Sequence, residues 1–234
     1  MKHSKILILD YSVDRSETAV IQRWLPKEAE VTPLFIDTAE SFPDQLIKEA
    51  YTHVIHTGSA LSINQPVPFA PKAIKYIRDL AGKRIPQMGI CYGHQLICLA
   101  LLGPQAIRKA PAGFEVGWPE VDFLVDTFQI PEVSKTERIW QHHFDEVIQL
   151  PEGSRIIAVN QHTHIQAYIN NQLRLFGTQF HPEFDREKGN EAFLKDRELL
   201  ARNNYDVDEI IKHGPSLEAG RIFFNFFLEY FKGE

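Results

Sequence analysis

The chain has 234 residues, of which 44% are hydrophobic and 24% are charged, and its 25 basic and 31 acidic residues give a net charge of −6. This composition is that of an ordinary globular domain, so it excludes intrinsic disorder and collagen-like order. The acidic balance argues against a nucleic-acid-binding protein, and no apolar run approaches the ~20 residues of a membrane span.

Short apolar runs alternate with amphipathic segments in the first part of the chain. Strands are expected at residues 5–10, 30–36, 52–57 and 84–90, and helices at 15–25, 43–50, 69–81 and 92–102. The strands are apolar almost throughout, as strands of a parallel sheet covered on both faces tend to be. This order of elements predicts an α/β fold with a doubly wound, mostly parallel sheet flanked by helices.

The second half of the chain has closely spaced strand candidates with turn residues between them. They lie at residues 105–109, 115–125, 146–150, 155–160, 165–169 and 174–180, and helices are expected at 186–203 and 217–231. The Asn170-Asn171 pair is typical of a hairpin turn. We therefore expect an antiparallel extension of the parallel sheet. No Gly/Ser-rich linker interrupts residues 1–234, which are expected to form a single domain.

The chain contains two cysteines, Cys91 and Cys98. Two cysteines are too few for the disulfide scaffold of a small secreted protein. The N-terminal segment also lacks the apolar region of roughly 7–15 residues that a signal peptide needs. These features predict a cytoplasmic protein.

Cys91 lies between an expected strand and an expected helix, in the sequence Gly-Ile-Cys-Tyr-Gly at residues 89–93. A glycine on each side of a central nucleophile at such a junction is typical of a nucleophile elbow. The start of a helix favours a thiolate over a thiol, so we expect a lowered pKa at this cysteine. The alternative is a small buried hydrophobic residue, which is the interpretation that we adopt for Cys98 in the middle of the helix.

A cysteine nucleophile needs a base, and His181 is the best candidate among the ten histidines. It follows the strand expected at 174–180, and open α/β sheets place their sites at strand ends. Glu183 lies two residues further on and is suited to orient the imidazole, as the acid of a catalytic triad does. Pro182 restricts the backbone between them.

Together these segments resemble the class I (triad-type) glutamine amidotransferase family. Residues 89–95 (Gly-Ile-Cys-Tyr-Gly-His-Gln) and 177–183 (Gly-Thr-Gln-Phe-His-Pro-Glu) carry most of the resemblance. Residues 143–147 (His-Phe-Asp-Glu-Val) resemble the segment ahead of the family's central hairpin, and residues 56–59 (His-Thr-Gly-Ser) resemble its oxyanion loop. The Glu-Val-Gly-Trp sequence at 115–118 is similar to the stand-alone branch, whose members resemble the amidotransferase domain of GMP synthase.

The resemblance implies a flavodoxin-like fold and a Cys-His-Glu triad. Cys91 would attack the γ-carbonyl of a glutamine-type side chain, His181 would transfer the proton, and Glu183 would hold the imidazole. The product would be a γ-glutamyl thioester, which water then hydrolyses. No cofactor and no metal are expected.

The resemblance also implies the residues that surround the triad. The backbone amides of Gly58 and Tyr92 would form the oxyanion hole. Gln95 and backbone groups near Phe144 would bind the substrate. The sequence departs from the family's pattern at two places. Phe144 replaces a glycine, and Gly-Ser-Ala at residues 58–60 replaces Gly-Gly-Pro.

Two sets of alternatives remain open at this point. The histidine pairs His142-His143 and His162-x-His164 are candidate metal ligands, although exposed histidines beside a turn are commoner. The favoured function is a hydrolase of glutamine or of γ-glutamyl compounds. The alternatives are a glutaminase subunit that supplies ammonia to a separate synthetase, because the amidotransferase region uses the whole chain, and a catalytically silent binding domain on the same scaffold. No nucleic-acid or membrane partner is expected.

Overall fold

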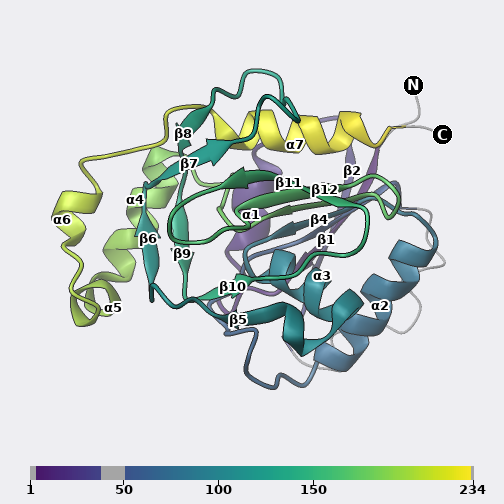
Figure 1. Cartoon of the computed structure of the whole chain (residues 1–234), viewed down its shortest axis with the longest axis horizontal. Helices are drawn as coiled ribbons and strands as arrows, with labels where there is room; N and C mark the ends of the chain where they lie inside the picture. Colours follow the sequence, from purple (N-terminus) through teal and green to yellow (C-terminus); the bar gives the residue numbers. More distant parts are fainter. Residues whose placement is uncertain (1–3, 38–50, 233–234) are drawn as a thin grey trace.

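The computed structural model describes residues 4–37 and 51–232. Its centre is a nine-stranded sheet with the order β2-β1-β3-β4-β13-β12-β11-β7-β8 (Figure 1). The parallel part consists of β2 (Glu30–Phe35), β1 (Lys5–Asp10), β3 (His53–His56), β4 (Gln87–Ile90) and β13 (Leu175–Thr178). The antiparallel part consists of β12 (Ala167–Asn170), β11 (Ser154–Val159), β7 (Glu120–Phe123) and β8 (Thr136–Arg138). The predicted fold class, a parallel sheet with an antiparallel extension, is therefore confirmed.

Helices cover both faces of the sheet. The helices α1 (Glu17–Gln22) and α7 (Ala219–Tyr230) pack on one face, and α2 (Ala70–Gly82) and α3 (Tyr92–Leu102) pack on the other (Figure 1). Alternate residues of β1 supply the two apolar cores, because successive side chains of a strand point to opposite faces. Ile6 and Ile8 lie in the core under α1 and α7, whereas Leu7 and Leu9 lie in the core under α2 and α3. Burial on both faces explains the unbroken apolar sequence of this strand.

Smaller elements form two separate two-stranded sheets and a group of helices. A 3₁₀ helix, η2 (Pro104–Ala106), precedes two short antiparallel pairs, β5 (Ile107–Lys109) with β10 (Asp145–Val147) and β6 (Glu115–Gly117) with β9 (Gln141–His143). The helices α4 (Arg186–Lys195), α5 (Arg197–Arg202) and α6 (Val207–Ile210) lie together beside β6 and β9 (left in Figure 1). A third apolar core, which contains Trp118, Trp140 and Phe193, packs under these helices.

Several predicted boundaries are wrong for identifiable reasons. The strand expected at 115–125 is two strands in different sheets, since Gly117 adopts φ +108° and Pro119 has no N–H for a ladder. The helix expected at 186–203 is two helices, because α4 ends at Lys195 and α5 begins at Arg197. The strand expected at 105–109 begins as the 3₁₀ helix. The elements β8, β9 and α6 were missed because three or four residues are too short to show a period.

Two further observations complete the description of the fold. The helix expected at 43–50 lies outside the described residues. Among the residues that are described, no helix combines the length and the apolar character that crossing a membrane demands.

Candidate active site

Cys91 occupies the turn between β4 and α3. Its backbone has φ 46° and ψ −102°, a strained conformation that non-glycine residues rarely adopt. Gly93, two residues on, lies so close to β3 that a Cβ there would come within 2.2 Å of the carbonyl oxygen of His56. The predicted elbow is therefore present, and Gly93 is needed for the close approach of the helix to the neighbouring strand end.

Cys91 is buried, and only 4% of the residue is exposed. Burial raises the pKa of the Cys91 thiol, and the nearby charge of Glu183 raises it further. The Tyr92 amide at the start of α3 lowers this pKa but does not outweigh burial. The expectation of a lowered pKa is therefore wrong for this site, because desolvation exceeds the effect of the helix terminus.

His181 and Glu183 lie beyond the end of β13 and form a hydrogen-bonded pair. The His181 Nδ1 atom is 2.5 Å from Glu183 Oε1, and both side chains are buried. Burial lowers the pKa of His181 to about 4 and raises the pKa of Glu183 to about 7. The imidazole is consequently neutral near pH 7 and donates its Nδ1–H to Glu183, so its Nε2 carries the lone pair of a base.

Loops from three adjacent parallel strands bring these groups together. The Cys91 amide donates to the Thr178 carbonyl at 2.8 Å, which joins the end of β4 to the end of β13. Gly58 follows β3 and touches the other side of the site, since a Cβ on it would lie 2.6 Å from His181 Cε1. Adjacent strand ends thus place Gly58, Cys91 and His181 at one edge of the sheet, as open α/β sheets commonly do.

The Gly58 loop is held by the hydroxyl of Thr57. This hydroxyl accepts from the Tyr11 amide at 2.9 Å and donates to the Gly58 carbonyl at 2.9 Å. Within the described part of the chain, the Gly58 amide makes no backbone hydrogen bond. It therefore remains available as a donor beside His181.

Gln95 and Phe144 lie on a neighbouring part of the site. Gln95 Nε2 donates to the Asp145 carbonyl at 2.9 Å and to Gln179 Oε1 at 3.0 Å, which ties α3 to the segment that contains Phe144. The Phe144 ring stacks on Phe114 with 4.1 Å between ring centroids. The aromatic ring that replaces the family's glycine thus has its own packing partner.

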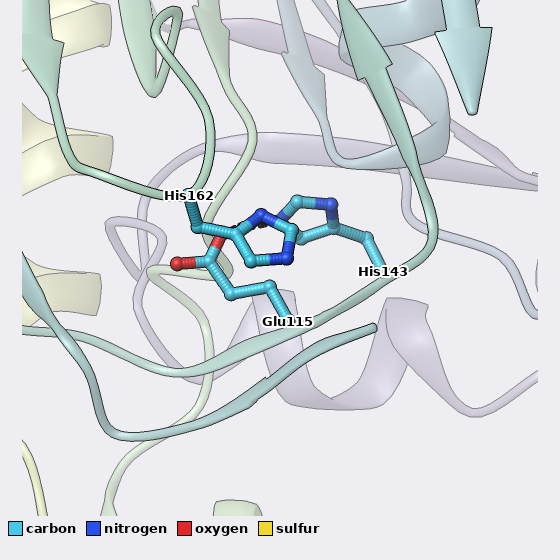
Figure 2. Close-up of side chains that lie close together, drawn as sticks. All are labelled: Glu115, His143 and His162. Atoms are coloured by element: carbon cyan, nitrogen blue, oxygen red, sulfur yellow. Dashed lines mark hydrogen bonds and ion pairs between the residues drawn. The ribbon is translucent and has the colours of Figure 1, made fainter. Parts of the chain in front are cut away.

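A second cluster consists of the buried Glu115 and His143 and the half-buried His162 (Figure 2). The structure separates the two predicted histidine pairs, because His142 contacts Asp196 at 3.1 Å and His164 is exposed, while His143 and His162 meet at Glu115. Glu115 was not among the predicted site residues. A carboxylate within the strand β6 was the available signal.

The Glu115 carboxylate is already occupied by hydrogen bonds. His143 Nε2 lies 2.8 Å from Glu115 Oε2, Gln166 Nε2 donates to the same oxygen at 2.9 Å, and Asn160 Nδ2 donates to Oε1 at 2.5 Å. His143 Nδ1 lies 3.0 Å from the Asp145 carbonyl, which can only accept. These separations suit a proton shared between His143 and Glu115. A zinc ion at about 2.0–2.2 Å from each ligand atom would force them apart.

Glu17 is a site residue that the sequence analysis missed. It begins α1, is buried, and offers a carboxylate oxygen within 4.8 Å of the ligand atoms of His181 and Glu183. An acidic residue in a helix with other polar residues gives no sequence signal until the buried face of the helix is known. Glu17 and His181 also line a cavity of about 350 Å³ that extends over α4 to Lys188 and Lys195.

Comparisons with known proteins identify related sequences and folds. The sequence model of the family "Glutamine amidotransferase class-I" matches residues 13–199, a range that contains every candidate residue of the site. The chain is 34% identical over 154 residues to a glutamine-hydrolyzing GMP synthase subunit of Sulfolobus acidocaldarius, and the match covers 64% of this chain and 79% of the relative. It is 29% identical over 228 residues to the glutamine-hydrolyzing GMP synthase of Wigglesworthia glossinidia brevipalpis, and that match covers 93% of this chain but 40% of the longer protein.

Solved structures give the same arrangement of the chain. A glutamine amidotransferase from Thermotoga maritima has a TM-score of 0.79 at 18% identity and covers 99% of both chains. A glutamine amidotransferase from Methylobacillus flagellatus has a TM-score of 0.71 at 19% identity and covers 98% of this chain and 93% of that chain. At these identities the likeness concerns the fold.

Proposed function

The chain belongs to the class-I glutamine amidotransferase family, and on that premise we propose that it hydrolyses the γ-glutamyl amide bond with Cys91, His181 and Glu183 as its catalytic triad. One observation carries the proposal. A strained cysteine on an elbow and a hydrogen-bonded His-Glu pair follow adjacent parallel strands, and the Cys91 amide is bonded to the strand that leads to His181. The substrate would be glutamine or another γ-glutamyl compound.

The first step is attack by sulfur on the γ-carbonyl carbon of the substrate. Because burial keeps the thiol protonated at rest, its proton passes to His181 Nε2 as the C–S bond forms. Glu183 accepts the hydrogen bond from Nδ1 and stabilises the imidazolium that results. The low pKa of the buried His181 makes it a neutral base before the substrate arrives.

The carbonyl oxygen becomes an anion in the tetrahedral intermediate. The amides of Tyr92 and Gly58 would bind this oxygen, since Tyr92 is the first residue of a helix and has no intrahelical acceptor. One such donor contributes about 2.7–4 kcal/mol of transition-state stabilisation. The intermediate then collapses as the imidazolium protonates the leaving nitrogen and the C–N bond breaks.

The remaining γ-glutamyl thioester is hydrolysed in a second cycle. His181 takes a proton from water, the resulting C–O bond forms at the thioester carbon, and the thiolate leaves and regains the proton. The amino-acid end of the substrate would lie against Gln95 and the backbone near Phe144. The hydrogen bond from Gln95 to the Asp145 carbonyl holds these two parts of the site together.

The fate of the leaving nitrogen distinguishes two candidate functions. The cavity of about 350 Å³ beside His181 gives room for a leaving group larger than ammonia, which favours hydrolysis of γ-glutamyl compounds in general. The second candidate is ammonia delivery to a separate synthetase. Ammonia delivery is favoured by three relatives that are named as a glutamine-hydrolyzing subunit of GMP synthase. The matches cover 79%, 72% and 77% of their length.

A panel of substrates tests both the chemistry and its direction. The purified chain is assayed alone with glutamine and with γ-glutamyl dipeptides, by measuring released glutamate. Cys91→Ser should abolish release, whereas Cys98→Ala, a matched change of the other buried cysteine, should retain it. Undiminished release by Cys91→Ser would refute the proposed mechanism. Dipeptide cleavage without glutaminase activity would exclude ammonia delivery, and glutaminase activity that rises with a copurifying synthetase would exclude the stand-alone function.

A further inference from the structure

Glu17 lies behind the His181–Glu183 pair, on the first turn of α1. The start of this helix is fixed by Asp10 at the end of β1, whose Oδ2 accepts from the amide and the hydroxyl of Thr18 at 2.9 and 2.6 Å. The Glu17 side chain is thereby held inside the protein, where its residue is 7% exposed. It is a buried carboxyl group at the site for which the mechanism above has no use.

At least one of the two buried carboxyl groups, Glu17 or Glu183, must be protonated. Glu183 Oε1 accepts from His181, but within the described part of the chain Glu183 Oε2 and Glu17 Oε2 are buried without a hydrogen-bond partner. The ligand atoms of Glu17, His181 and Glu183 all lie within 4.8 Å of one another. Two carboxylates so close together in a buried site cannot both be ionised at low cost, so one proton is held between them.

Glu17 is the partner that holds this proton. Burial raises the pKa of Glu17 well above its ordinary value, and the charge of Glu183 raises it further. Glu183 is instead committed to the Nδ1–H of His181, which favours its anion. When Glu17 is protonated and donates to Glu183, one hydrogen bond gives both of these unpaired oxygens a partner.

Resting on the proposed function, we propose that Glu17 is a positioning residue, which stays protonated in the working enzyme and donates a hydrogen bond to Glu183 so that this carboxylate keeps its orientation toward His181. The triad is thereby extended by one neutral acid. Glu17 also limits the negative charge near Cys91, because a second anion there would oppose formation of the thiolate. Raising the pH until Glu17 ionises should therefore slow the reaction.

The neighbours of Glu17 set the sign of this effect. Groups that face it from other elements are His181, Glu183, Cys91 and Asp10, and the charged groups around the adjoining cavity are Asp14, Lys188, Glu191, Lys195 and Asp196. His181 alone among the near groups becomes cationic during the cycle, and it already pairs with Glu183. Ionisation of Glu17 therefore adds an anion beside another anion, and the net effect is unfavourable.

Two substitutions separate a protonated donor from an anion. Glu17→Gln keeps a hydrogen-bond donor and removes the ionisation, so its kcat near neutral pH should stay within about threefold of wild type, while the alkaline loss of rate moves up by about one pH unit. Glu17→Ala leaves Glu183 Oε2 without a partner, and its kcat should fall at least about tenfold with little change in KM. Glu198→Gln, the same change on the exposed surface of α5, is the control and should alter neither kcat nor its pH dependence.

Contrary results are equally specific. Equal losses of kcat in Glu17→Gln and Glu17→Ala would overturn the proposal, because an anion would then be the functional form. A rise in KM at unchanged kcat would also overturn it and would assign Glu17 to direct binding of the substrate. If Glu17→Ala does not fold, as circular dichroism would reveal, the pH profile of Glu17→Gln decides alone.

Alkylation of Cys91 by iodoacetamide, measured in a Cys98→Ala background, distinguishes this proposal from the proposed function. It needs no substrate, so it is informative even if the wild-type chain hydrolyses no γ-glutamyl compound. We expect wild type and Glu17→Gln to react equally fast at about pH 6–7 and Glu17→Gln to react faster at alkaline pH, once Glu17 ionises in the wild type. Faster alkylation of Glu17→Gln already at about pH 6 would overturn the proposal, since Glu17 would then be an anion at neutral pH.

Discussion

Gly58 provides a test of the site because its lack of a side chain leaves room for the His181 imidazole. A Cβ at this position would lie 2.6 Å from His181 Cε1, which is 0.8 Å inside the 3.4 Å at which ordinary van der Waals contact begins. The ring has little room to retreat, because Trp140 packs edge-on against it with 4.8 Å between centroids and Phe184 lies at 5.6 Å. Gly58→Ala should therefore displace either the imidazole or the loop.

Both consequences can be estimated. A misplacement of about 1 Å in a catalytic group costs on the order of 10²-fold in rate, so we expect kcat/KM to fall by about that factor. Overpacking of a filled site costs about 1–3 kcal/mol of the free energy of unfolding. The assays are kcat/KM on the best substrate of the panel and urea unfolding at the same pH.

Gly82→Ala is the matched control. Gly82 is the last residue of α2, and a Cβ there would meet nothing within 4 Å. Alanine should stabilise the helix by about 0.5–1 kcal/mol and leave the rate unchanged. Wild-type kcat/KM in Gly58→Ala would show that the clash is relieved at no cost and that Gly58 does not fix the position of His181.

Two further predictions concern stability. Glu115→Gln should lose about 3 kcal/mol at neutral pH, because it breaks a buried pair with His143. Burial alone would raise the pKa of Glu115, but the hydrogen bond and charge of His143 hold it below its ordinary value. The stabilisation is thus present above the unfolded pKa of about 4.3 and is lost as the pH falls through the folded pKa, so wild type and variant should converge in thermal unfolding at acid pH, below that folded pKa; a difference that persists there would contradict this origin. Cys91→Gly should be more stable than Cys91→Ala by about 1 kcal/mol in urea unfolding, since only glycine relieves the φ of 46°, and equal stabilities would mean that the elbow stores no strain.

The sequence predicted those parts of the fold that carry a long or repeated signal. β1 and α3 were placed at their observed bounds, because a strand buried on both faces and a helix buried over most of its surface are unmistakably apolar. Pairing in the small sheets was beyond prediction. β9 and β10, for example, have three residues each and are separated by Phe144 alone, so their strand character comes from partners that are distant in sequence.

The residues of the candidate site also fall into those with a local sequence signal and those without one. Cys91, His181 and Glu183 were found because each belongs to a local motif at the end of an expected strand. Glu17 and Glu115 were not, because their roles depend on which side chains face them from other elements. A sequence read along one strand or one helix contains no information on a carboxyl group that approaches from a different layer of the fold.

Protonation is the property that the motifs predicted least well, and burial explains why. The position of Cys91 at the start of α3 suggested a thiolate, whereas the enclosed site raises the pKa of its thiol and lowers that of His181 to about 4. Both shifts favour a neutral thiol beside a neutral imidazole, so the resting site does not hold a thiolate–imidazolium pair. In the mechanism that we propose, the imidazolium would form only as the substrate's carbonyl oxygen receives the negative charge, at an oxyanion hole of backbone amides. Reaction with the substrate's amide would then be coupled to proton transfer, and the same burial that disfavours the free thiolate would protect the cysteine from oxidation between turnovers.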